Sequence, residues 1–100
     1  MYVIVWQYDV RPERRAEFES IYGSEGKWSD LFRATSGYVR TDLLRDISVQ
    51  NRYVTLDWWV NEDAFGAFIQ TQREAYLALD RETEELTVSQ TRLGALVPPV

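Results

Sequence analysis

Residues 52–65, RYVTLDWWVNEDAF, carry the clearest structural signal in this 100-residue chain. The first part alternates side chains with a period of two, which is the period of a β-strand. Asn61 follows directly after Val60, the last residue of this run. Asparagine is a preferred N-cap because its side-chain oxygen can accept from a free N–H of the next helical turn. The pattern predicts a strand over Arg52–Val60 that passes directly into a helix beginning near Glu62.

A second strand precedes this one and pairs with it. Gly37 turns the chain into Tyr38–Arg45, and the polar stretch Asp46–Asn51 returns it to the strand described above. Two strand-like runs separated by a short polar turn are typical of a β-hairpin.

Strict alternation assigns the side chains of this hairpin to two faces. One face would hold Asp57 and Trp59 together with Arg40 and Asp42, and so would mix large aromatic and charged side chains. A solvated face would hold fewer aromatics, and unpaired charges are costly in an ordinary core. We therefore expect a dimer interface or a polar-lined pocket on this face.

The remaining chain adds a strand and helices on each side of the hairpin. Tyr2–Val10 is a predicted strand, and Pro12 suits the first turn of a following helix, with a second short helical piece over Trp28–Ala34. Beyond the hairpin, an apolar stripe at helical spacing predicts one long helix, and Leu86–Leu96 is the last strand. The order predicts a single α+β domain over residues 1–100, a ferredoxin-like βαββαβ fold with a four-stranded antiparallel sheet.

Composition excludes several function classes. Sixteen acidic residues against eleven basic ones give a net charge of −5, which repels nucleic acids and anionic membranes. The chain has no cysteine and no histidine, so disulfides, thiolate or imidazole metal sites, haem ligation through histidine and Ser-His-Asp catalysis are excluded. No apolar run is long enough for a membrane span. We expect a cytoplasmic protein without metal or cofactor.

Short motifs across nearly the whole chain resemble one family. They are Tyr8-Asp9-Val10-Arg11-Pro12 before Glu17-Phe18-Glu19, Gly37-Tyr38 before Leu43-Leu44-Arg45-Asp46, Trp59-Val60-Asn61-Glu62-Asp63-Ala64-Phe65, and Leu86-Thr87 before Leu93-Gly94. In these motifs the chain resembles the antibiotic biosynthesis monooxygenase-like family of the dimeric α+β barrel superfamily. The resemblance implies a homodimeric α+β barrel. Phe68 stands where family members often have a histidine, so an activity that depends on that histidine is not expected. Members that degrade haem use a histidine ligand as well, and this chain has none, which disfavours haem degradation.

The resemblance also implies catalytic residues. Some members of the family are cofactor-independent oxygenases that hold a polycyclic phenol or quinol, whose own carbanion reduces dioxygen. By resemblance, Trp59 would stack on the substrate ring and Asn61 would hydrogen-bond an oxyanion. Tyr76 could donate a proton from the long helix. The alternatives are a core tryptophan, an N-cap asparagine and a tyrosine of the apolar stripe.

A second set of residues would surround the substrate. Arg92 and Arg40 could bind an enolate or carboxylate, or could instead pair with Asp42 or Asp57. The full set of candidate substrate-binding residues is Trp6, Trp28, Phe32, Asp57, Phe65, Phe68 and Arg92. The alternative for the aromatic members is an ordinary core, which needs no ligand. The acidic run Asp80–Glu85 lacks the spacing of a cation site and is expected to be a solvated face.

Two functions follow from these observations. The first is a cofactor-independent monooxygenase that acts on a small aromatic or quinol-type compound. The alternative is a homodimer of the same fold that binds a small molecule without turning it over, or that serves a structural role only.

Overall fold

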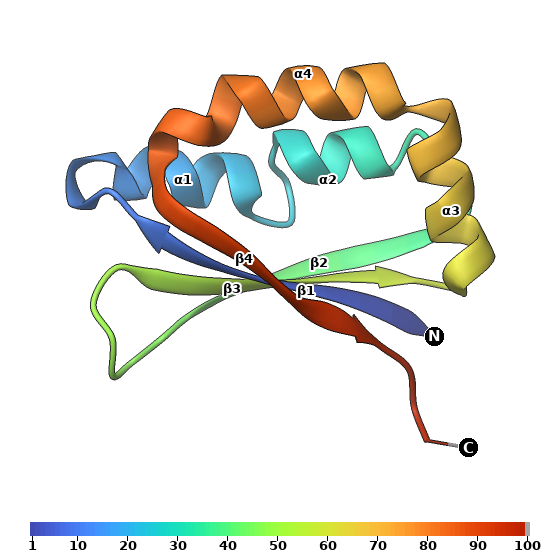
Figure 1. Ribbon diagram of the computed structural model, residues 1–100, viewed down its shortest axis with the longest axis horizontal. Coiled ribbons are helices and arrows are strands. Elements are labelled where there is room, and N and C mark those ends of the chain that lie inside the picture. The colour runs from blue at the N-terminus through green and yellow to red at the C-terminus, as the bar shows by residue number, and fades with distance from the viewer. Residues whose placement is uncertain (100) are drawn as a thin grey trace.

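The computed structural model describes residues 1–99 (Figure 1), so Val100, the end of the predicted domain, lies outside the described residues. Two short 3-10 turns lie at Pro12–Arg14 and Glu84–Leu86. The helices and strands in chain order are β1 (Tyr2–Val10), α1 (Arg15–Tyr22), α2 (Lys27–Phe32), β2 (Tyr38–Arg45), β3 (Arg52–Trp59), α3 (Glu62–Thr71), α4 (Arg73–Thr83) and β4 (Thr87–Leu96).

The four strands form one antiparallel sheet in the order β2-β3-β1-β4. The helices lie on one face of this sheet and leave the other face uncovered (Figure 1). This arrangement confirms the predicted ferredoxin-like α+β fold and its hairpin. None of the helices in residues 1–99 is both long and apolar enough to cross a bilayer.

The predicted long helix after β3 is two helices. The backbone leaves the helical conformation at Gln72, with φ −114° and ψ 19°, and the Thr71 hydroxyl donates to the Ala67 carbonyl at 2.8 Å. Threonine bonds of this kind often bend helices. As a result, α4 turns away from α3 and runs over α1 and α2 (Figure 1).

An irregularity in β2 changes which side chains share a face. Tyr38 is opposite Trp59, but Arg40 rather than Val39 is opposite Trp58, so one extra residue is inserted in β2. A β-bulge of this kind reverses the alternation beyond it. Thr41 therefore lies opposite Asp57 on the helix-covered face.

Arg40 and Asp42 consequently lie on the uncovered face, which corrects the sequence-based assignment. The Arg40 Nε lies 3.2 Å from the Asp42 carboxylate, and the guanidinium sits 5.1 Å from the ring centre of Trp58. The Trp58 indole donates to Asp42 at 3.0 Å. The three side chains satisfy one another away from the helices, and Arg40 is not part of the site described below.

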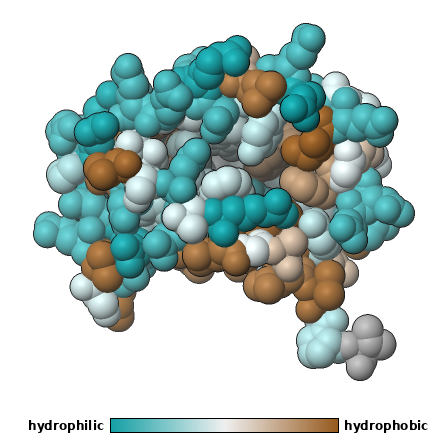
Figure 2. Space-filling model, in the orientation of Figure 1, coloured by the Kyte–Doolittle hydropathy of each residue, from teal (hydrophilic) through white to brown (hydrophobic). Residues whose placement is uncertain are grey.

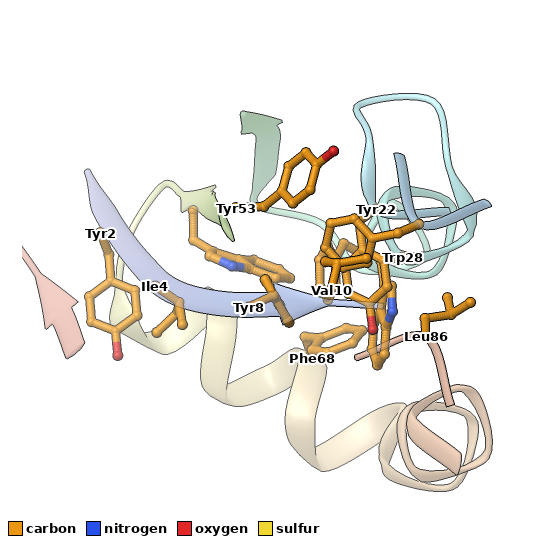
Figure 3. Packing of buried hydrophobic residues seen from close by; sticks show 12 residues of the cluster. Tyr2, Ile4, Tyr8, Val10, Tyr22, Trp28, Tyr53, Phe68 and Leu86 are labelled. Atoms are coloured by element: carbon orange, nitrogen blue, oxygen red, sulfur yellow. The ribbon is translucent and has the colours of Figure 1, made fainter. Parts of the chain in front are cut away.

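The core lies between the helices and the sheet and is mostly aromatic (Figure 3). Phe18 stacks on Tyr22 with ring centres 4.2 Å apart, and it also contacts Tyr8 and Tyr53 at 5.3 Å and 5.0 Å. Aromatic pairs add about 0.5–1.5 kcal/mol each beyond simple burial. This packing holds α1 firmly against β1 and β3.

Candidate functional site

A cavity of about 290 Å³ lies between the helix-covered face of the sheet and the helices. Figure 2 shows the surface hollowed between the helix layer and the sheet. The wall is mainly aromatic, with a few polar groups from the strands and α4. Its residues are Ile4, Trp6, Tyr8, Tyr22, Trp28, Phe32, Thr41, Thr55, Asp57, Phe65, Ile69, Tyr76, Asp80, Gln90 and Arg92. An apolar wall with few polar groups is usual in small-molecule sites.

Asp57 is the distinctive polar group of this wall. Its side chain is only 8% exposed, and no cationic side chain in residues 1–99 forms an ion pair with it. The Thr41 hydroxyl donates to its Oδ1 at 2.8 Å. Burial raises the pKa of Asp57 to about 7, despite the opposing effect of the Thr41 bond. Asp57 can therefore both accept and release a proton near neutral pH.

The tyrosines around Asp57 behave differently. Burial raises the pKa values of Tyr8, Tyr22 and Tyr76 above the ordinary value for a phenol. All three hydroxyls remain protonated at neutral pH and can only donate or accept hydrogen bonds. The Tyr22 hydroxyl donates to Thr83 at 3.1 Å, whereas the Tyr76 hydroxyl bonds to no other described residue. Tyr76 is thus available to a ligand.

Seven of the ten candidate residues from the sequence line the cavity: Trp6, Trp28, Phe32, Asp57, Phe65, Tyr76 and Arg92. The alternative of pairing with Asp42 or Asp57 is seen for Arg40, which pairs with Asp42. Arg92 is exposed and forms no ion pair within residues 1–99. Its guanidinium is free to meet an anionic ligand.

Trp59 and Phe68 lie outside the cavity wall. Both are fully buried, and their ring centres are 5.4 Å apart. Phe32 packs against both, at 5.7 Å from Trp59 and 5.1 Å from Phe68. The structure places these two residues in the core behind the wall, and the Trp59 ring has no surface exposed to the cavity.

Asn61 also lies outside the wall. Its Oδ1 accepts from the Ala64 N–H at 2.9 Å, which caps α3, and the residue is exposed. The side-chain oxygen is therefore already used by the helix.

We expect Asn61→Ala to lower the free energy of unfolding by about 1 kcal/mol, because the cap is lost. Asn61→Ser should restore most of it, since serine also caps. Urea denaturation of the three proteins measures the difference. An oxyanion-binding role for Asn61 would show itself instead as a loss of turnover in both variants.

Several wall residues were not predicted. Strict alternation sets Thr41 on the face opposite Arg40 and Asp42, and so apart from Asp57. The bulge in β2 that brings it beside Asp57 depends on pairing with β3, which local alternation does not reveal. Tyr8 and Tyr22 had the spacing of ordinary core residues. Thr55 and Gln90 carried no signal beyond their places in strands.

Comparison with known proteins identifies the family. The sequence model described as antibiotic biosynthesis monooxygenase matches residues 1–82. No curated protein matches the chain significantly.

Among solved structures, a mutant of SnoaB, a cofactor-independent oxygenase from Streptomyces nogalater, is 25% identical, with a TM-score of 0.79 over 97% of this chain and 91% of that one. A putative antibiotic biosynthesis monooxygenase from Bordetella bronchiseptica has the same fold at 19% identity, with a TM-score of 0.77 over 99% and 97% of the two chains. A putative monooxygenase of this kind from Deinococcus radiodurans is 14% identical, with a TM-score of 0.74 over 100% and 94%. By its sequence and its fold, this chain belongs to the antibiotic biosynthesis monooxygenase family.

Proposed function

We propose that the protein is a cofactor-independent monooxygenase that acts on a small, flat phenol or quinol bound in the cavity. The observation that carries the proposal is a lone buried carboxyl, Asp57, whose pKa is raised to about 7 in an aromatic-walled cavity. The similarity to SnoaB, a cofactor-independent oxygenase, supports the same proposed function.

Asp57 supplies the base in this proposal. The ligand ring lies against Trp6, Trp28, Phe32 and Phe65, and the ionised Asp57 accepts an acidic proton from it. Arg92 attracts the resulting anion, and the neutral Tyr76 hydroxyl donates a hydrogen bond to it.

The anion then reacts with dioxygen. One electron passes from the carbanion to dioxygen, and the resulting radical pair combines to a hydroperoxide that takes up a proton. Breakage of the O–O bond with loss of the remaining hydrogen from that carbon gives a carbonyl and water. An anthrone would yield an anthraquinone, with one oxygen atom in the product and the other in water.

Oxygen uptake tests this function directly. Purified protein is incubated with anthrones, naphthols and quinols, with and without dioxygen, while quinone absorbance is followed. Oxygen-dependent product above the uncatalysed rate supports the proposal. Saturable quenching of tryptophan fluorescence without product would assign the cavity to ligand binding alone, and no quenching would favour a structural dimer.

The uncovered face of the sheet supports a homodimer. Leu44 and Leu96, on the two edge strands, are 53% and 57% exposed, and their partners in the register, Val54 and Val3, share that face. Hydrophobic side chains gather along this side of the molecule (Figure 2). A large apolar surface of this kind usually marks an interface. We propose that a second copy of this single-domain chain covers it and completes the α+β barrel.

The double variant Leu44→Glu/Leu96→Glu is expected to sediment as a monomer, because burying four carboxylates per dimer is strongly unfavourable. Wild type should sediment at twice the mass of one chain. Ile47→Glu is the matched control, since Ile47 is 92% exposed in the β2–β3 turn, and it should remain dimeric. Equal sedimentation of all three proteins would remove this face as the interface.

A further inference from the structure

The carboxyl group of Asp57 is held from one side only. The Thr41 hydroxyl bonds to Oδ1, and no other group in residues 1–99 forms a hydrogen bond or ion pair with either oxygen. Oδ2 is therefore left for a ligand in the cavity, while Oδ1 faces β2.

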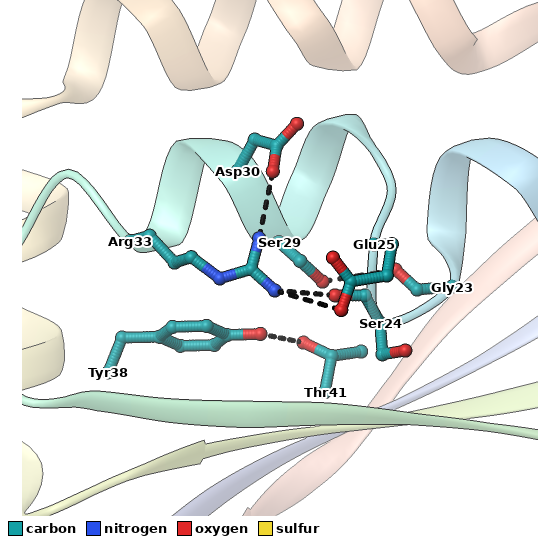
Figure 4. A network of polar contacts seen from close by, with 8 residues as sticks. All are labelled: Gly23, Ser24, Glu25, Ser29, Asp30, Arg33, Tyr38 and Thr41. Atoms are coloured by element: carbon teal, nitrogen blue, oxygen red, sulfur yellow. Dashed lines mark hydrogen bonds and ion pairs between the residues drawn. The ribbon is translucent and has the colours of Figure 1, made fainter.

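The bond from Thr41 continues to a third residue. The Tyr38 hydroxyl lies 2.7 Å from the Thr41 Oγ1 (Figure 4). A threonine hydroxyl carries one proton, and in the ionised site that proton points to Asp57. Tyr38 must then be the donor to Thr41, so the chain of donors runs from Tyr38 through Thr41 to Asp57.

Tyr38 lies outside the cavity. It is half-buried at the start of β2 and is not part of the cavity wall, whereas Thr41 and Asp57 are. The β2 bulge brings all three hydrogen-bonding groups to the same side of the sheet. Bulges often re-aim a side chain near a functional site.

We propose that Thr41 and Tyr38 are positioning residues that form a hydroxyl relay, through which Asp57 exchanges its proton while a ligand occupies the cavity. The inference rests on the proposed function. When the ligand has given a proton to Oδ2, a half-turn of the Asp57 carboxyl brings that proton to face Thr41. Asp57 then passes the proton to the Thr41 oxygen, Thr41 passes its own proton to the Tyr38 oxygen, and the half-buried Tyr38 releases its own proton to solvent. The proton thus leaves on the side away from the ligand, and Asp57 is ionised again.

Other titratable groups line the same cavity as Asp57. They are Tyr8 on β1, Tyr22 on α1, Tyr76 and Asp80 on α4 and Arg92 on β4. None of them hydrogen-bonds to Asp57. The relay is therefore the one direct link between Asp57 and another polar group among residues 1–99.

Carbon-13 NMR titration of the Asp57 carboxyl tests the relay without any substrate. Thr41→Val keeps the shape of the side chain but removes the donor, and it should raise the pKa of Asp57 by about one unit or more. Thr41→Ser keeps the hydroxyl, so the pKa of Asp57 in this variant should lie within a few tenths of a unit of its value in wild type. Tyr38→Phe removes the outer donor and should produce a smaller rise.

Turnover provides the second readout. Tyr38→Phe should lower kcat by about ten-fold with KM unchanged, and it should alter the solvent deuterium isotope effect on kcat. Titration curves of Thr41→Val and Tyr38→Phe that match wild type would overturn the relay. If the titrations shift but wild type consumes no dioxygen, the link to Asp57 stands while the proposed function, and with it the relay's catalytic purpose, fails. If Thr41→Val does not fold, the titration of Asp57 in Tyr38→Phe alone decides whether the relay exists.

Discussion

Replacing Asp57 with asparagine should lower oxygen-dependent turnover at least about a hundred-fold, the usual size of a lost general base. The amide has nearly the same shape and can still accept the Thr41 bond, but it cannot take a proton. Ligand binding depends mainly on the aromatic wall, so KM should change little. The measurement is the initial rate of oxygen uptake with the best substrate of the panel.

The pH dependence of turnover is a second test of Asp57 as the base. Only the ionised Asp57 can act as the base, and burial raises its pKa to about 7. Activity of wild type should therefore rise with pH and level off above about 7. Asp63→Asn is the matched control, because Asp63 is exposed in the first turn of α3 and should show the wild-type profile. Undiminished turnover in Asp57→Asn, or a profile that is flat from pH 5 to 8, would rule out this role for Asp57.

The sequence predicts the strands well because their signals are local. Tyr2–Val10 and Tyr38–Arg45 have the same bounds in the structure as in the prediction, since alternation and flanking glycine or proline act over a few residues. The break at Gln72 was missed although Gln72 interrupts the apolar stripe, because the stripe resumes at Tyr76 and Leu79 with helical spacing. The bulge in β2 depends on how that strand pairs with β3, and a one-residue shift moved Thr41 to the opposite face.

The candidate site was predictable in its location but not in its chemistry. The aromatic residues and Asp57 could be gathered from strand faces and helix spacing. Trp59 and Asn61 were singled out by resemblance, yet in the structure the ring is enclosed by the core and the amide caps a helix. What distinguishes Asp57 is its burial without a cation, which arises only once β1, β3 and the helices close around it.

Asp57 should also make the stability of the fold depend on pH. An ordinary aspartate has a pKa of 3.8, and burial raises that of Asp57 to about 7 in the folded protein. Below pH 4 the group is neutral in both the folded and the unfolded chain, and its contribution to stability is fully present. Between pH 4 and 7 the unfolded chain gives up the proton while the folded protein keeps it. The free energy of unfolding therefore falls with rising pH, by about 4 kcal/mol in total at about 1.4 kcal/mol per pKa unit.

Asp57→Asn removes this dependence. The difference in unfolding free energy between the variant and wild type should grow from pH 4 to 7 in favour of the variant and then stay constant. Asp9 and Asp46, whose pKa values are lowered by Arg52 and by backbone N–H groups respectively, act in the opposite direction. They are present in both proteins, so their effects cancel in the difference.

Urea denaturation at fixed protein concentration and at four pH values between 4 and 8.5 gives this difference. The free energy of unfolding of Asp63→Asn should follow the same pH dependence as that of wild type. If Asp57→Asn also follows the wild-type pH dependence, Asp57 ionises normally. A widening gap would mean that the fold carries an ionisable group which weakens it at neutral pH. Proteins commonly lose stability at the residues on which activity depends. The stability curve and the activity profile should then bend at the same pH, because a single carboxyl controls both.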